Sequence, residues 1–268
     1  MIPKVSVLIS VYNQVRNLAL VLRGLENQSM KEFEVIIGDD GSTEEMQTFV
    51  KQYRGSFPLQ HVWHADQGFR RSKILNEAFK QISTDYCIFM DSDCIPHHHF
   101  VRDHWKAREH NTVLCGRRVE LSERMSTNLS VDDIAERRHQ KVAVSTIVDI
   151  LLGRAANWEE NIRLPFAAAA RLIHWKTPTL LGSNFSLDRS LFERVNGFNE
   201  DYVGYGMEDS DLAHRLQLAG AELKPLRHRA IQYHLYHQRN QPTENNIMLF
   251  QETLKHADRM CKNGLQKL

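Results

Sequence analysis

The first third of the chain alternates between two hydrophobic periods. Short runs that are almost continuously apolar, as in strands covered on both faces, occupy residues 5–11, 33–37 and 86–90. Between them, apolar residues recur at the i, i+3, i+4, i+7 spacing of a helix face, over residues 18–25, 46–53 and 75–82. With a fourth short strand near residues 61–63, the β-α-β-α-β-α-β order predicts an α/β fold. It has a mostly parallel central sheet, right-handed crossovers and helices on both faces.

The middle of the chain breaks this rhythm. Residues 132–154 and 158–175 have the composition of helices. This stretch is also basic, and its cations are Arg137, Arg138, Lys141, Arg154, Arg163 and Arg171. We expect one continuous domain in three parts, which are residues 1–116, a helical basic insertion at 117–180, and residues 181–268.

After this insertion, secondary structure becomes predictable again. Asp188 is a candidate N-cap of a short helix that Gly197 ends, and a second helix is expected from Glu208 to Gly220. Strands near Leu223 and over residues 231–233 follow, and then a polar helix from about Glu244.

Composition excludes several classes of protein. The 268 residues are 42% hydrophobic, enough to build a core, and a net charge of +1 argues against a nucleic-acid partner. No signal-peptide pattern begins the chain and residues 5–11 are too few to span a membrane, so we expect a cytoplasmic protein. The four cysteines lack CxxC spacing and are expected to be reduced thiols: Cys87, Cys94, Cys115 and Cys261.

Polar residues follow three of the predicted strands, at the sheet edge where ligands bind in folds of this kind. They are Tyr12-Asn13, Asp39-Asp40-Gly41-Ser42 and Asp91-Ser92-Asp93. The first strand is not followed by a GxGxxG turn or a GxxxxGK[ST] loop, which argues against nicotinamide chemistry and P-loop ATP hydrolysis. An Asp-x-Asp after a buried strand offers hard oxygen ligands suited to Mg²⁺ or Mn²⁺, although in isolation the same tripeptide is a common solvated turn.

Together these motifs resemble the family 2 glycosyltransferases of the GT-A fold, whose central sheet is Rossmann-like. The matching segments are residues 5–13, 35–42 and 89–93. Three later segments look like the acceptor-side region shared by animal β-galactosyltransferases and bacterial chondroitin polymerase: Gly182-Ser183-Asn184-Phe185-Ser186, Val195-Asn196-Gly197-Phe198 and Gly204-Tyr205-Gly206-Met207-Glu208-Asp209. The resemblance covers both ends of the chain and omits the middle.

The resemblance implies a nucleotide-sugar donor bound at the strand ends. Asp40, with Asp39 beside it, would accept the imide N–H of uracil, and a cluster before the third helix would contact the diphosphate. The residues expected at the donor are Ser10, Tyr12, Asn13, Asp39, Asp40, Gln67, Arg71, Asn76, Asp91, Ser92 and Asp93. The alternatives are a capping turn at residues 39–42 and a solvated helix start at residues 67–73.

The resemblance also implies the catalytic and acceptor-side residues. Asp209 would be the general base that deprotonates the acceptor hydroxyl, and Glu208 would hold a substrate hydroxyl. Asn184, Gly206 and Met207 would lie on the acceptor side. The alternative for the two carboxylates is ordinary acidic charge in the first turn of a helix.

The expected metal ligands lie far apart in sequence. Relatives complete their metal site with a ligand pair at the spacing of His234 and His237, which would join Asp93 and Asp91 here. Imidazole with carboxylate favours Mn²⁺ over Mg²⁺. The alternative is that one or both histidines pack on a loop. A rival cluster, His97-His98-His99, is weaker because consecutive side chains diverge.

These expectations combine into one predicted activity. It is inverting transfer of a hexose or N-acetylhexosamine, best galactose or N-acetylgalactosamine, from a UDP-sugar to a saccharide or lipid-linked saccharide. The basic insertion, with its apolar run at residues 146–148, would cover a growing polysaccharide or hold an anionic lipid-linked acceptor at the inner face of a membrane. The alternatives are a sugar-nucleotide pyrophosphorylase, which needs a glycine- and lysine-containing loop in place of residues 12–14, and a non-catalytic nucleotide-sugar-binding protein.

Overall fold

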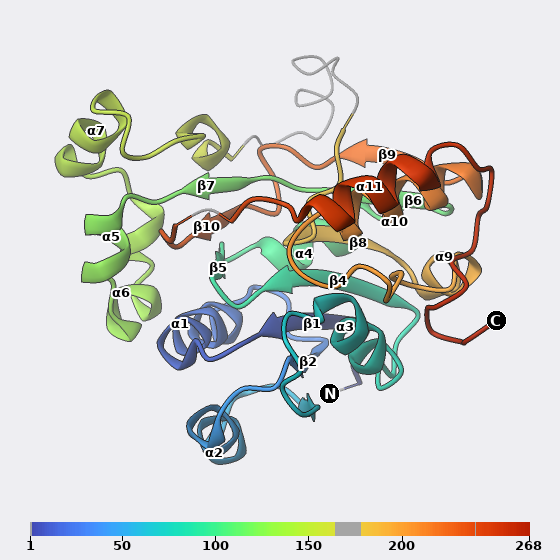
Figure 1. Ribbon diagram of the computed structural model, residues 1–268. Coiled ribbons are helices and arrows are strands. Elements are labelled where there is room, and N and C mark those ends of the chain that lie inside the picture. The colour runs from blue at the N-terminus through green and yellow to red at the C-terminus, as the bar shows by residue number, and fades with distance from the viewer. Residues whose placement is uncertain (1, 164–177, 239) are drawn as a thin grey trace.

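A seven-stranded sheet forms the centre of the computed structural model, which describes residues 2–163, 178–238 and 240–268 (Figure 1). The strand order is β3-β2-β1-β4-β8-β6-β9. The strands are β1 (Val5–Val11), β2 (Phe33–Asp39), β3 (Leu59–Trp63), β4 (Tyr86–Asp91), β6 (Thr112–Cys115), β8 (Asn184–Asp188) and β9 (Glu222–Pro225). β8 alone runs antiparallel to its two neighbours, β4 and β6, so the predicted α/β fold with a mostly parallel sheet is confirmed.

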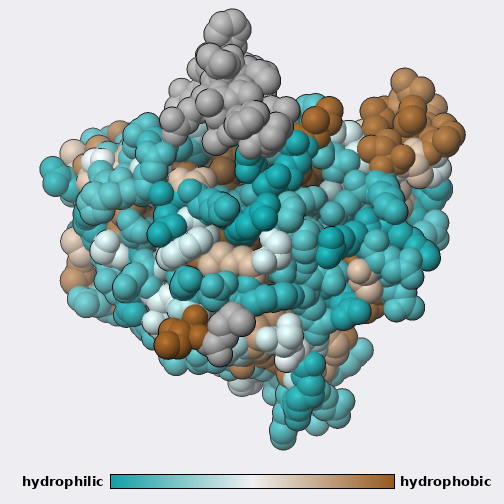
Figure 2. Space-filling model, turned by 180° about the vertical axis from the view of Figure 1, so that it is seen from behind, coloured by the Kyte–Doolittle hydropathy of each residue, from teal (hydrophilic) through white to brown (hydrophobic). Residues whose placement is uncertain are grey.

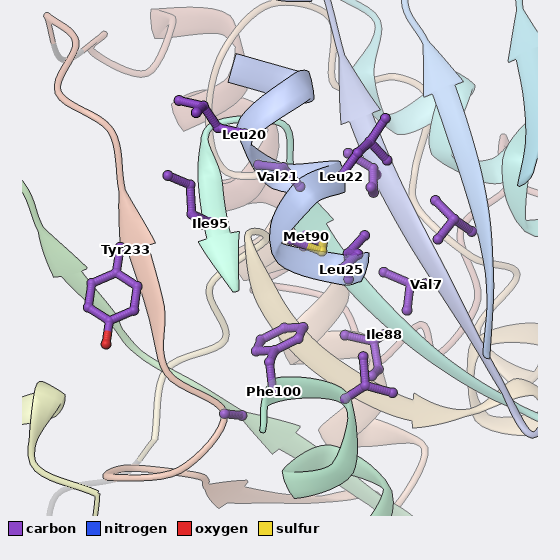
Figure 3. Packing of buried hydrophobic residues seen from close by; sticks show 14 of the residues in the cluster. Val7, Leu20, Val21, Leu22, Leu25, Ile88, Met90, Ile95, Phe100 and Tyr233 are labelled. Atoms are coloured by element: carbon purple, nitrogen blue, oxygen red, sulfur yellow. The ribbon is translucent and has the colours of Figure 1, made fainter. Parts of the chain in front are cut away.

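Successive side chains of β1 enter two different cores. Val7 and Ile9 pack with α1 (Val15–Glu26) and α4 (Phe100–Ala107), whereas Leu8 packs on the other face with α3 (Arg71–Phe79). Figure 3 shows the first core, in which the predicted apolar face of α1 lies against β1 and β4. α2 (Glu44–Gln52) adds to the same core. Most residues of the strand are apolar because both faces are covered.

A smaller sheet of three strands stands beside the main one. Its order is β5-β10-β7, from β5 (Cys94–Pro96), β10 (Gln232–His234) and β7 (Arg118–Glu120). β5 continues directly from the loop after β4, and β10 comes from near the end of the chain. This sheet therefore joins the Asp91–Asp93 loop to the C-terminal segment.

The middle of the chain differs from its prediction. Instead of one helix over residues 132–154, the structure has α5 (Glu123–Asn128), α6 (Val131–Ala135), a 3₁₀ turn at Arg138–Gln140 and α7 (Val144–Leu151). Ser130 and Asp133 form a capping box that starts α6, and Arg137 in a left-handed conformation (φ 59°) interrupts the helical path. Of the helix expected over 158–175, Trp158–Asn161 is a 3₁₀ turn, while residues 164–177, including Arg171, lie outside the described residues.

The C-terminal elements follow their predictions closely. They are α9 (Arg189–Arg194), α10 (Glu208–Leu218) and α11 (Glu244–Thr253). Asp188 occupies the N-cap position of α9, although its side chain makes no capping hydrogen bond. Among the described residues, no helix combines the length and the apolar character needed to cross a bilayer.

Candidate active site

An open cleft of about 960 Å³ lies at the ends of β1 and β4. Among the parts of the chain that it brings together are the strand ends of the first third, the start of α10, and the histidines at and just beyond the end of β10. The predicted site residues that line it are Ser10, Tyr12, Asp40, Arg71, Asp91, Ser92, Asp93, Gly206, Met207, Glu208, Asp209, His234 and His237. Five other predicted residues do not line it: Asn13, Asp39, Gln67, Asn76 and Asn184.

Asn13 and Asp39 shape the loop that carries Asp40. The Asp39 carboxylate accepts the Ser42 backbone N–H at 2.8 Å, and Asn13 Oδ1 accepts that of Thr43 at 2.8 Å. Asn13 itself adopts a left-handed conformation with φ 51°. In this structure both residues therefore act on the turn after β2 and not on the cleft.

Asn76 and Asn184 are fully buried. Asn76 exchanges hydrogen bonds with the backbone of Phe198, donating at 2.9 Å and accepting at 2.9 Å. Asn184 donates to the carbonyls of Arg117 and Ala230 at 2.7 and 3.0 Å. Both asparagines hold motif segments together from beneath the cleft. Gln67, in contrast, lies at the surface, where its Oε1 accepts from Arg70.

Asp40 is a cleft residue that two neighbours hold in place. Its carboxylate accepts the backbone N–H of Arg70 at 2.7 Å and contacts His64 Nε2 at 2.7 Å. Burial raises the pKa of Asp40, and the contacts with His64 and Arg70 oppose that rise. Each oxygen still has a lone pair to offer, as a contact with a base imide would require. Tyr12 stands nearby, half-exposed, and donates to Asp66 at 2.9 Å.

Arg71 joins the two halves of the cleft. From the first turn of α3, its guanidinium donates to Asp91 Oδ1 at 2.7 Å and to the Gly182 carbonyl at 2.9 Å, and Nη1 lies 3.6 Å from Glu208 Oε1. Burial opposes the charge of this buried side chain, but the carboxylates of Asp91, Glu208 and Asp209 raise its pKa. Arg71 thus remains a cation between the Asp-x-Asp loop and α10.

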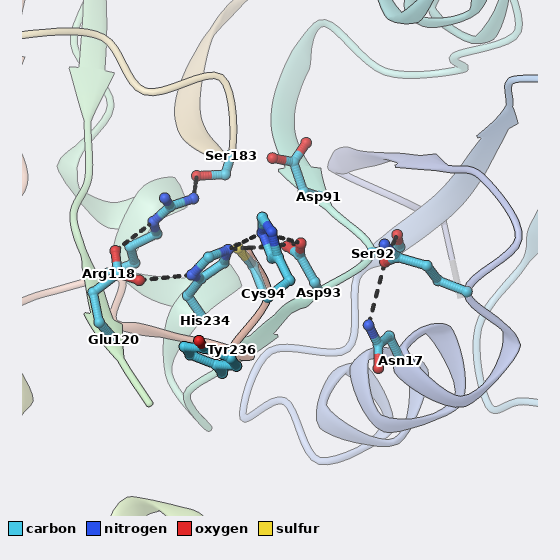
Figure 4. Close-up of polar contacts among 12 residues, drawn as sticks. Asn17, Asp91, Ser92, Asp93, Cys94, Arg118, Glu120, Ser183, His234 and Tyr236 are labelled. Atoms are coloured by element: carbon cyan, nitrogen blue, oxygen red, sulfur yellow. Dashed lines mark hydrogen bonds and ion pairs between the residues drawn. The ribbon is translucent and has the colours of Figure 1, made fainter. Parts of the chain in front are cut away.

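Three side chains of types that can bind a metal ion converge in another part of the cleft (Figure 4). Asp93 Oδ2 lies 3.3 Å from His237 Nε2 and 3.6 Å from His234 Nε2, and the two imidazole nitrogens are 3.1 Å apart. Donor atoms at this spacing fit neighbouring ligands of one cation held at about 2.1 Å. The set of one carboxylate and two imidazoles suits a divalent ion such as Mn²⁺. Asp91 points away from this set toward Arg71.

The electrostatics of this cluster are mutual. Although burial opposes ionisation of Asp93, its contacts with the two histidines hold the pKa of the carboxyl well below its usual range. Burial likewise opposes the charge of His234, but Asp93 and Glu120 raise its pKa to about 9. The neighbouring Cys94 remains a thiol because burial raises its pKa. Its Sγ nevertheless lies close enough that Asp93, Cys94 and His234 offer possible ligand atoms within 4.8 Å of one another.

α10 directs two carboxylates into the cleft from its N-terminal turn. The chain reaches the helix through three left-handed residues, Gly204, Gly206 and Met207, with φ 86°, 96° and 73°. Asp209 Oδ2 accepts the Gly182 backbone N–H at 3.2 Å. Burial raises the pKa of Glu208. The charge of Arg71 lowers this pKa, and the neighbouring carboxylate of Asp209 raises it. The helix N-terminus stabilises negative charge at this position.

Among the cleft residues that the sequence analysis missed, Glu120 and Arg118 lie beside the histidines. Glu120 contacts His234 Nδ1 at 2.7 Å, and Arg118 Nε donates to Glu120 at 2.9 Å. Neither belongs to a recognisable motif, because both lie at the start of the basic insertion. Only the pairing of β7 with β10 brings them to the histidines.

Sequence comparison identifies relatives over most of the chain. The family Glycosyl transferase family 2 matches residues 6–195, and a second family, described as "N-terminal domain of galactosyltransferase", matches residues 164–238. Validoxylamine A glucosyltransferase of Streptomyces hygroscopicus subsp. jinggangensis is 27% identical, over 82% of this chain and 52% of its own. Chondroitin synthase of Escherichia coli is 24% identical, over 85% of this chain and 34% of its own. The chain thus spans about half of one relative and a third of the other.

Solved structures share the fold. Residues 1–349 of Staphylococcus aureus TarS superpose with a TM-score of 0.56 at 20% identity, covering 86% of this chain and 60% of theirs. The mannosyltransferase PcManGT of Pyrobaculum calidifontis, in complex with GDP-Man and Mn²⁺, gives a TM-score of 0.57 at 18% identity, covering 90% of this chain and 59% of its own. The family match extends over more than half of the residues, and the fold agrees with it. The chain therefore belongs to glycosyl transferase family 2.

Proposed function

We propose that this chain is an inverting glycosyltransferase that moves a hexose or N-acetylhexosamine from a UDP-sugar to a hydroxyl of a saccharide or lipid-linked saccharide. Galactose or N-acetylgalactosamine is the preferred sugar. The observation that carries the proposal is the convergence in one cleft of a carboxylate and imidazole cluster, Asp93, His234 and His237, with the acidic N-terminus of α10. The first could hold a divalent ion against the diphosphate of the donor, and the second provides a carboxylate for the acceptor hydroxyl.

The donor would lie along the strand ends. Asp40 and Tyr12 offer contacts for a uracil base, and Ser10, held to Asp91 at 2.9 Å, marks where the ribose and diphosphate would pass. Asp93, His234 and His237 would hold a Mn²⁺ or Mg²⁺ ion. When bound, such an ion supplies charge neutralisation for the departing diphosphate.

The transfer would be a single displacement. The acceptor oxygen forms a bond to the anomeric carbon while the bond from that carbon to the diphosphate breaks, and the diphosphate leaves with the electron pair. Asp209 takes the proton of the acceptor hydroxyl, and the hydrogen bond from Gly182 N–H fixes its carboxylate. Glu208 and Arg71 would orient substrate groups beside it. Attack opposite the leaving group inverts the anomeric configuration.

The decisive experiment is UDP release from a panel of UDP-sugars in Mn²⁺, Mg²⁺ or EDTA. Asp209→Asn should lower turnover by about 10²- to 10⁴-fold, because it removes the general base, and should retain UDP binding. Glu252→Gln, a carboxylate-to-amide change at the exposed surface of α11, is the matched control and should leave turnover unchanged.

Each alternative function predicts a different result in the same assay. Full turnover in Asp209→Asn would remove this residue from the base role. UDP binding by the wild type without release from any UDP-sugar, with or without acceptor, would favour a non-catalytic nucleotide-sugar-binding protein. Formation of a UDP-sugar from UTP and a sugar phosphate would indicate a pyrophosphorylase.

We further propose that the acceptor is met at an anionic membrane surface. α7 exposes aliphatic side chains, and Figure 2 shows them gathered on a protruding corner of the molecule. The exposed residues are Val142, Val144, Ile147, Val148, Leu151 and Leu152. Arg137, Lys141 and Arg154 lie close by in sequence and form no ion pair with another described residue. Aliphatic side chains flanked by cations match the interface of an anionic bilayer.

A further inference from the structure

We propose that Glu120 is a positioning residue for the metal site, which it serves by fixing the imidazole of His234. This inference rests on the proposed metal-dependent transfer and adds to it a residue outside the ligands themselves. It assigns a role to β7, at the start of the basic insertion, for which the motifs of the chain provide none.

The register of the small sheet places Glu120 beside His234. β10 pairs in parallel with β7 so that His234 lies opposite Glu120, and in antiparallel with β5 so that His234 also lies opposite Cys94. Asp93 immediately precedes Cys94, and its carbonyl accepts the Leu235 backbone N–H at 2.9 Å. Directly opposed residues share one face of a sheet, so this register decides which side chain His234 meets.

In this register, each ring nitrogen of His234 has a defined polar neighbour. Nδ1 lies 2.7 Å from Glu120 Oε2, and Nε2 faces Asp93 and His237 (Figure 4). A carboxylate beside Nδ1 keeps a proton on that nitrogen, so Nε2 is the nitrogen whose proton a metal ion would displace. Histidine ligands are commonly oriented by such a partner, which also makes the imidazole a better donor.

Glu120 is itself held in place. Its other oxygen, Oε1, accepts from Arg118 Nε at 2.9 Å, and Arg118 reaches Ser183 Oγ at 3.4 Å on the far side. The backbone of Glu120 exchanges hydrogen bonds with Ala156, at 3.0 and 3.2 Å. Neutralisation of Arg118 therefore accounts for only one oxygen of Glu120, and the contact of the other oxygen with His234 requires a separate explanation.

The chain provides a matched control for removal of this carboxylate. Glu160, like Glu120, lies in the wall of the cleft and pairs with an arginine, Arg227, but makes no hydrogen bond or ion pair with Asp93, His234 or His237 in the described structure. Replacement of Glu160 by glutamine therefore repeats the loss of charge beside an arginine without touching the proposed ligands.

The experiment measures Mn²⁺ affinity by electron paramagnetic resonance in the presence of saturating UDP, together with UDP affinity in EDTA. Glu120→Ala should weaken Mn²⁺ binding about 10- to 100-fold, the range for loss of such a partner. Glu120→Gln should weaken it less, because its amide oxygen still accepts from Nδ1–H. Both variants should bind UDP in EDTA like the wild type, and Glu160→Gln should keep wild-type Mn²⁺ affinity.

The Mn²⁺ measurements distinguish failure of the role of Glu120 from failure of the metal site itself. Wild-type Mn²⁺ affinity in both Glu120 variants, with weak binding in Asp93→Asn, would overturn the role of Glu120 and leave the proposed metal site standing. Equal Mn²⁺ binding by the wild type and Asp93→Asn would overturn the metal site itself, and the inference with it. If Glu120→Ala fails to fold, Glu120→Gln and Arg118→Met decide, since each should still weaken Mn²⁺ binding while Glu160→Gln does not.

Discussion

Asn184 shows how one residue of a recognisable motif can serve the core. Its amide group donates to two backbone carbonyls, and its Oδ1 lies 3.1 Å from His104 Nε2. Gly116 lies so close that a Cβ there would come within 2.2 Å of Asn184 Oδ1. The sequence analysis predicted Asn184 on the acceptor side, whereas the structure buries its side chain outside the cleft lining. The sequence pattern identifies the motif but not the direction in which its side chains point.

The buried partner of Asn184 has a consequence for acid stability. His104 is fully buried against Asn184 and Ser186, and burial lowers its pKa to about 4. An unfolded histidine has a pKa of about 6.5, so between these two values the unfolded state binds the extra proton. Stability should therefore fall as the pH is lowered through 6.5 toward 4, by about 2 kcal/mol at pH 5 from this residue.

Urea unfolding at pH 7 and pH 5 checks this prediction. His104→Gln should be less stable than the wild type at pH 7, yet should lose about 2 kcal/mol less on acidification. His97 and His139, whose pKa values burial also lowers, account for part of the remaining loss. An identical loss in the wild type and His104→Gln would show that His104 is not protonated on unfolding.

At the scale of elements, the helices and strands of the first third were predictable because each has one unambiguous hydrophobic period. β1 is apolar at nearly every position and both of its faces are covered, while α1 buries one stripe. The insertion has no such period. Its helices are short, and capping at Ser130 and the left-handed turn at Arg137 decide where α6 begins and where the helical path breaks.

The start of α10 depends on a turn that only glycine enters without strain. Gly206 has φ 96°, and a Cβ there would lie 2.8 Å from Pro242 Cβ. Gly206→Ala should cost about 1–2 kcal/mol of stability, since a left-handed conformation is strained in other residues. It should also lower turnover. The backbone must move to relieve the clash between the new Cβ and Pro242, and this movement displaces Glu208 and Asp209, which follow the turn directly.

Gly220 is the matched control for this turn. It has φ 83°, lies just beyond the other end of α10, and a Cβ there would meet no atom within 4 Å. Gly220→Ala should lower the free energy of unfolding, measured in urea, by about as much as Gly206→Ala does. It should keep the wild-type rate of UDP release. If the two variants retained equal turnover, the position of the Gly206 turn would not matter to the reaction.

At the scale of the whole molecule, the basic insertion contributes both the protruding α7 corner and part of the cleft wall. Residues 157 and 160, which follow α7 in sequence, line the cleft. An acceptor whose lipid lies in a membrane contacted by α7 would then meet a cleft that the same insertion helps to line. This arrangement gives the apolar corner a use that is compatible with the proposed transfer.

Vesicle co-sedimentation tests this contact. The wild type should sediment with phosphatidylglycerol vesicles at low salt and less with phosphatidylcholine vesicles. Leu151→Asp, at a side chain that is 80% exposed, should reduce binding about tenfold or more, because a buried leucine contributes about 1.5–3 kcal/mol. Met248→Asp, at a side chain on α11 that is 60% exposed, should bind like the wild type.

Two outcomes would contradict the membrane contact. Wild-type protein that remains in the supernatant with anionic vesicles at low salt would exclude it. Equal sedimentation with both lipids would exclude the contribution of Arg137, Lys141 and Arg154. Unchanged unfolding midpoints in both aspartate variants would confirm that neither change acts through stability.

The sequence by itself determined the α/β fold, the family and the ends of the strands where polar residues gather, because these depend on local periodicity and on contiguous motifs. The cleft is a tertiary property. Asp93 and His234 are 141 positions apart in numbering and meet only because β5 and β10 pair, and Glu120 joins them only because β7 pairs with β10 in one register. Such pairing follows from the packing of the whole chain, which no local pattern encodes.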